Sequence, residues 1–192
     1  MAEDSEDFRQ ELTNGIAKSR RYAGYFDWPD KTIKERGIAE DFVPAYVLLT
    51  GVSVKIVGLG DDPPDVILMS DRGEKLALEL TELVDQKIAE KGQYTNVALL
   101  ADWPDEKLRK QICKILARKD SKLGSLDRGL YPLCLLVIHT DETLLTPERL
   151  QRVLNPPIQT RNIDGAFVLF SYEPHTQACP LAQISVARST CS

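Results

Sequence analysis

The chain has 192 residues, of which 43% are hydrophobic and 28% are charged, and its formal net charge is −5. This length and composition predict one soluble domain, residues 1–192, with a substantial buried core. The negative charge argues against a domain that binds nucleic acid through a strongly basic surface, although a local basic stripe can coexist with a negative total.

The cysteines and the N-terminus indicate the cellular compartment. The four cysteines are scattered, without a Cys-x-x-Cys pair that would indicate zinc or a redox motif, so reduced thiols are expected. The acidic first residues lack the basic and apolar parts of a signal peptide, and no apolar run approaches the ~20 residues of a membrane span. We therefore expect a cytoplasmic protein without membrane contact.

Two helices are predicted before the first strand. Residues 5–24 carry an apolar stripe at helical spacing, formed by Phe8, Leu12 and Ile16. A second helix opens at residues 27–30 and either ends before Pro44 or continues through it. Its buried side is predicted to comprise Ile33, Gly37, Ile38, Phe42 and Ala45. A strand over residues 52–57 follows.

A β-hairpin is predicted from two apolar runs, residues 63–70 and 74–83, which are separated by Asp71-Arg72-Gly73. If these three residues form the loop with Gly73 in the left-handed conformation, Ser70 pairs with Glu74 and Asp65 lies opposite Glu79 on one face. A two-residue loop would place Asp65 on the other face. The position of the glycine favours the first register.

Glu79 interrupts a strand rich in Leu and Ala, where a charge is costly unless a cation or hydrogen bonds compensate it. Paired with Asp65 across the hairpin, it could hold Mg²⁺, which takes oxygen ligands and can activate water. Thr81 shares the face of Glu79 because residues two apart in a strand point the same way. In the alternative interpretation, Asp65 caps a turn and Glu79 pairs with a lysine or arginine from a covering helix.

A basic helix is predicted from Pro104 to about Leu123. Its apolar stripe is surrounded by the basic residues Lys107, Arg109, Lys110, Lys114, Arg118, Lys119 and Lys122. These cations either face a phosphate backbone or form a solvated surface that balances nearby acids.

The C-terminal half predicts further strands and one helix. A nearly continuous apolar run, residues 130–139, predicts a buried central strand. A helix begins at Thr146-Pro147, a second buried strand covers residues 166–172, and residues 181–186 add an edge strand. The order of elements predicts an α/β fold with a mixed β-sheet flanked by helices on both faces.

The order Pro64-Asp65, a hairpin and then Glu79-Leu80-Thr81 resembles the PD-(D/E)xK nuclease superfamily, in which an Asp, and then an acid, any residue and a lysine, lie on adjacent strands. Residues 78–83 are similar to a poorly characterised bacterial branch with threonine at the lysine position. The resemblance implies a restriction endonuclease-like core over residues 31–140. Residues 1–30 would then be an N-terminal helical extension, and residues 141–192 a C-terminal helix-strand extension.

The same resemblance implies that Asp65 and Glu79 bind Mg²⁺ or Mn²⁺, that Thr81 holds a ligand or water, and that a helix glutamate assists. We prefer Glu35 to Glu40 for this role. Because position 81 is not lysine, another cation must substitute for it, and the candidates are Lys75, Lys87, Lys119 and Lys122. Lysines near the last two look like a recurring feature of the branch.

The implied function is hydrolysis of phosphodiester bonds in DNA by a metal-dependent endo- or exodeoxyribonuclease. The alternative is a nuclease-like fold that has lost catalysis and serves as a binding or regulatory module. The intact acid pair favours the nuclease, whereas Thr81 and the negative charge favour the module. Both functions are compatible with a protein partner or a homodimer.

Overall fold

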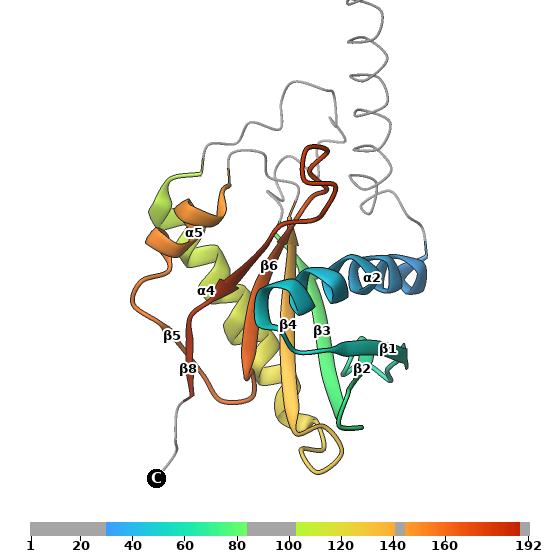
Figure 1. Ribbon diagram of the computed structural model, residues 1–192. Helices are drawn as coiled ribbons and strands as arrows, with labels where there is room; N and C mark the ends of the chain where they lie inside the picture. Colours follow the sequence, from blue (N-terminus) through green and yellow to red (C-terminus); the bar gives the residue numbers. More distant parts are fainter. Residues whose placement is uncertain (1–29, 84–102, 141–144, 189–192) are drawn as a thin grey trace, which may run out of the picture.

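The structure is a computed structural model that describes residues 30–83, 103–140 and 145–188 (Figure 1). The expected helix over residues 5–24 and the candidate Lys87 lie outside these ranges. Within the described ranges, no helix combines the length and the apolar character needed to cross a membrane.

One mixed sheet of six strands forms the centre of the fold. Its strands are β1 (Val54–Leu59), β2 (Val66–Ser70), β3 (Lys75–Glu82), β4 (Leu133–Thr140), β6 (Gly165–Phe170) and β7 (Leu181–Ile184), and they lie in the order β1-β2-β3-β4-β6-β7. The first three strands are antiparallel, β3, β4 and β6 are parallel, and β7 is antiparallel at the edge. The prediction of a mixed sheet with a buried central strand and a C-terminal edge strand is confirmed.

Helices cover both faces of this sheet, as predicted (Figure 1). Helix α2 (Lys31–Thr50) packs on one face, whereas α4 (Asp105–Lys122) and α5 (Pro147–Val153) pack on the other. In β3 the leucines at positions 76, 78 and 80 face α2, and Ala77 faces α4. Because side chains alternate along a strand, Glu79 also points toward α4.

Helix α2 continues through Pro44 and ends at Gly51, which has the left-handed φ of 71°. Its N-cap is Asp30, whose carboxylate accepts hydrogen bonds from the backbone N–H groups of Thr32 and Ile33. The prediction that Ile33 is buried is wrong, since 52% of its surface is exposed. The buried residues of this helix begin only at Ile38.

The hairpin has the predicted three-residue loop. Gly73 has a φ of 80°, and the backbone N–H of Ser70 donates to the carbonyl of Glu74 over 2.9 Å. The paired residues run from Met69 and Lys75 to Val66 and Leu78. The next pair in this register is Asp65 and Glu79, so their side chains share the face that α4 covers.

Two short strands were not predicted. β5 (Ile158–Thr160) and β8 (Val186–Arg188) form a separate two-stranded parallel sheet. With three residues each, they are too short to show a periodic pattern.

Candidate metal centre

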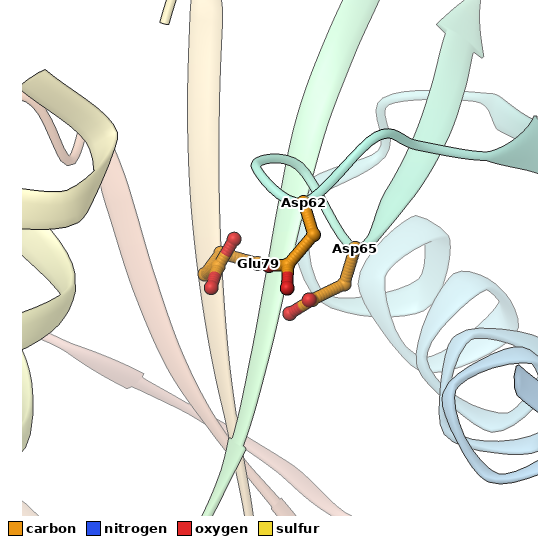
Figure 2. A group of neighbouring side chains, drawn as sticks. All are labelled: Asp62, Asp65 and Glu79. Carbon is orange, nitrogen blue, oxygen red and sulfur yellow. The ribbon is translucent and has the colours of Figure 1, made fainter. Parts of the chain in front are cut away.

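Three carboxylates converge where the turn before β2 meets β3. Asp62 lies in that turn, Asp65 directly precedes β2, and Glu79 lies in β3 (Figure 2). One oxygen from each residue lies within 4.8 Å of the other two. Elsewhere in the described residues, no group of three or more His, Cys, Asp or Glu side chains comes as close.

Asp65 is held in place by the hairpin register and by one hydrogen bond. Asp65 is 4% exposed, and its Oδ2 accepts a hydrogen bond of 2.7 Å from the backbone N–H of Leu80. Burial raises the pKa of Asp65 to about 6, and the negative charge of Glu79 adds to the rise, although the Leu80 hydrogen bond opposes it. Asp65 can therefore exchange a proton near neutral pH.

Glu79 is completely buried. Its Oε1 accepts hydrogen bonds from Lys119 Nζ at 2.6 Å and from Lys122 Nζ at 2.5 Å. Its Oε2 is buried too, and no hydrogen-bond donor in the described part of the chain reaches it. A buried carboxylate oxygen without a partner is costly, so the described residues leave one acceptor of Glu79 unsatisfied.

Asp62 belongs to the cluster and was not predicted as a site residue. Its carboxylate accepts hydrogen bonds from Lys122 and, over 3.3 Å, from Lys31. The hydrogen bond from Lys122 lowers the pKa of Asp62 to about 2. The acidic pair before the two prolines was a weak signal in the sequence, because either Asp61 or Asp62 could have joined Asp65.

The turn that carries Asp62 depends on a close approach between backbones. Gly60 donates its N–H to the carbonyl of Asp65 over 3.0 Å, and Asp62 donates to that of Pro64 over 3.2 Å. A Cβ atom on Gly60 would lie 2.0 Å from the Pro64 carbonyl oxygen. Only glycine fits this position without a shift of the turn.

Helix α4 supplies the cations Lys119 and Lys122. Lys119 is 7% exposed, donates to Glu79 and, over 2.6 Å, to the carbonyl of Leu80, and lies 3.8 Å from Asp65 Oδ2. Burial alone would lower the pKa of Lys122, but its hydrogen bonds to Asp62 and Glu79 outweigh burial and raise it. Glu79 thus pairs with a covering helix, as the ion-pair interpretation predicted, and these lysines are also two of the candidates to replace the motif lysine.

Thr81 lies two residues beyond Glu79 on β3 and is not part of the acid cluster. Its hydroxyl accepts a hydrogen bond of 3.2 Å from the Arg118 guanidinium. Lys75, another candidate for the missing lysine, lies at the opposite end of β3, beside the hairpin loop. Four residues of strand separate it from Glu79, which corresponds to roughly 13 Å.

The two helix glutamates occupy different positions. Glu35 pairs with Lys31 at 3.2 Å, and Lys31 in turn contacts Asp62. The charge of Glu35 also contributes to the raised pKa of Asp65. Glu40 instead pairs with Arg36 over 2.9 Å, and both of their side chains are more than half exposed. Of the two glutamates, Glu35 is therefore the one that lies near the acid cluster.

The donor set matches a hard divalent cation. Three carboxylates provide oxygen ligands of the kind that Mg²⁺ and Mn²⁺ prefer, whereas the histidine and thiolate ligands typical of zinc are absent from this cluster.

No protein-family model, no curated protein and no solved structure matches the chain. The function must therefore be inferred from the site itself.

Proposed function

We propose that this protein is a metal-dependent nuclease that hydrolyses phosphodiester bonds in DNA. The observation that carries the proposal is the buried pair Asp65 and Glu79, which is joined by Asp62 and by two lysine ammonium groups. Asp62, Asp65 and Glu79 would hold Mg²⁺ or Mn²⁺. The fully buried Glu79 retains one oxygen that no donor in the described residues reaches, which favours a ligand-binding role over a purely structural ion pair.

The order of elements supports the same proposal. Helix α2, the antiparallel strands β1 to β3, helix α4 and the parallel strand β4 follow one another between residues 31 and 140. This order agrees with the restriction endonuclease-like core that the resemblance implies. We propose that residues 31–140 form such a core.

Each residue of the site has a specific role in the proposed reaction. A bound divalent ion would supply a water of lowered pKa and neutralise charge on a phosphoryl oxygen. Lys119 is fixed by Glu79 and by the Leu80 carbonyl, so its ammonium group can stabilise charge that develops on the phosphate. Arg118 brings a second cation to Thr81, the position of the motif lysine. Glu35 orients Lys31, which contacts Asp62.

The second candidate function is a binding or regulatory module on a fold that has lost catalysis. One observation favours it: Lys31, Lys119 and Lys122 already contact the three carboxylates, so the charges are largely balanced without a metal. Threonine at position 81, where the motif has lysine, also favours this second function.

Cleavage assays distinguish the two functions. Single- and double-stranded DNA, with RNA in parallel, would be incubated with Mg²⁺ or Mn²⁺ and wild-type protein, Asp65→Asn or Glu79→Gln. The matched control is Asp61→Asn, which removes a neighbouring acid outside the cluster. We expect metal-dependent DNA cleavage that both site variants abolish and the control retains. A folded wild-type protein that cuts nothing would leave the binding module as the better description.

A further inference from the structure

The ammonium group of Lys122 lies among all three carboxylates of the cluster. Its Nζ contacts Asp62 Oδ1, lies 2.5 Å from Glu79 Oε1 and lies 3.9 Å from Asp65 Oδ1. These are the three residues whose oxygens come close enough together to hold one metal ion. Lys122 therefore places a positive charge where the proposed metal would bind.

Lys119 differs from Lys122 in its partners and in its burial. Besides Glu79 and Asp65, Lys119 contacts the carbonyl of Leu80, and its side chain is 9% exposed. The Lys122 side chain is 33% exposed and belongs to the last residue of α4. A partly exposed lysine at a helix end can change rotamer without opening the core, whereas a buried lysine cannot.

We infer that Lys122 is an exchangeable cation that competes with a divalent metal for Asp62, Asp65 and Glu79. This inference rests on the proposed metal site and concerns its regulation. A metal ion held by the same three carboxylates would repel the adjacent ammonium group, and Lys122 has an exposed side to which it can move. Without metal, Lys122 contributes one of the three lysine charges that balance the three carboxylates.

Arg118 provides a neighbouring cation on α4 for the displaced Lys122. Arg118 lies four residues before Lys122, so both side chains project from the same side of α4. The Arg118 guanidinium already lies at Thr81. A phosphate that binds the Arg118 guanidinium would also attract a Lys122 ammonium released from the carboxylates, because its negative charge neutralises both cations. Binding of the metal would then raise the affinity for a nucleic-acid phosphate, and binding of the phosphate would raise the affinity for the metal by the same factor.

Metal affinity tests the inference without any measurement of activity. Mn²⁺ binding would be titrated by calorimetry, or by the electron paramagnetic resonance signal of unbound Mn²⁺, in wild type, Lys122→Gln and Lys114→Gln. The control removes an exposed lysine from the same helix and changes the net charge equally. We expect Lys122→Gln to bind Mn²⁺ about tenfold more tightly than wild type, which lies in the usual range of coupling between sites, and Lys114→Gln to match wild type.

A measurement on the wild-type protein makes the test independent of how Lys122→Gln folds. With ¹³C-labelled lysine, the Lys122 side-chain signal is assigned as the one that disappears in Lys122→Gln or, if that variant does not fold, in Lys122→Arg. We expect this signal to shift when Mg²⁺ is added, while the Lys114 signal stays in place. A Lys122 signal that does not respond to saturating Mg²⁺ would overturn the inference.

The outcomes separate this inference from the proposed function. If wild type and Lys122→Gln bind Mn²⁺ equally, and Glu79→Gln abolishes binding, the metal site stands and the exchange is wrong. If neither protein shows saturable binding, both proposals fail. If Lys122→Gln binds Mn²⁺ more tightly but wild type cuts no DNA, the exchange stands and the nuclease assignment fails.

Discussion

Lys119 and Glu79 form a buried ion pair that joins helix α4 to the centre of the sheet. The distance between Nζ and Oε1 is 2.6 Å, Lys119 is 7% exposed and Glu79 is completely buried. Two buried charges are tolerated only when each has partners, because removal of one leaves the other uncompensated. The stability of the fold and the arrangement of the site therefore depend on the same contact.

Lys119→Met should destabilise the protein by about 3 kcal/mol, the lower end of the range for breaking a buried pair, because Lys122 still contacts Glu79. Lys122→Met should cost at most about 1 kcal/mol, since a third of its side chain is exposed. Urea denaturation of both variants measures the difference. The double variant Lys119→Met/Glu79→Leu should recover most of the loss. Equal losses in the two single variants would contradict the structural role of Lys119.

Some of this site could be predicted from the sequence because local patterns specify it. Gly73 sets the hairpin loop, and the loop sets Asp65 opposite Glu79. The burial of Lys119 could also have been predicted, because it continues the helical stripe of Leu108, Ile112 and Leu116. Both features follow from the spacing of residues within a short, continuous segment of the chain.

Other parts could not be predicted because they depend on contacts between distant segments. Asp62 joins the cluster only through the shape of its turn, and the neighbouring Asp61 would have been an equal candidate. The position of Arg118 beside Thr81 depends on how α4 packs on β3, across 37 residues of sequence. The strands β5 and β8 pair with each other and are too short to have a pattern of their own.

Gly60→Ala should weaken metal binding and destabilise the protein by about 2 kcal/mol, as expected for an atom inserted into a packed site. The added methyl group would lie 2.0 Å from the Pro64 carbonyl oxygen and would displace the turn that carries Asp62. Gly58→Ala is the matched control, because no neighbouring atom lies within 4 Å of the position that its methyl group would take. Thermal unfolding and Mn²⁺ titration measure both effects. Wild-type values for Gly60→Ala would show that the turn does not position the cluster.

Metal affinity should fall as the pH is lowered through about 6, the pKa of Asp65. Below this pH a proton occupies the carboxylate and competes with the metal, so the affinity should fall by up to about tenfold per pH unit. Above pH 7 the affinity should be constant. Mn²⁺ titration between pH 5 and pH 8 measures the profile.

Asp62→Asn provides the control for this profile. The pKa of Asp62 is about 2, so Asp62 remains ionised over the whole pH range, and its removal should weaken binding without moving the inflection. An affinity that stays constant down to pH 5 would mean that the Asp65 carboxylate titrates near the ordinary value of ~3.9.

Arg118→Gln should slow DNA cleavage without unfolding the protein. The guanidinium lies on the exposed side of α4, 3.2 Å from the Thr81 hydroxyl, so its loss leaves the core intact and should change stability by less than about 0.5 kcal/mol.

If Arg118 contacts a phosphate, DNA binding should weaken and the slope of its salt dependence should fall by about 1. Arg36→Gln removes the same charge from an exposed side chain of α2, which packs on the face of the sheet opposite α4, and should leave the slope unchanged. Fluorescence anisotropy with labelled DNA at several salt concentrations measures the slopes. The same slope in both variants would exclude Arg118 from the phosphate contact and leave Lys119 as the remaining cation fixed at the site, because its ammonium is held by Glu79 and by the Leu80 carbonyl.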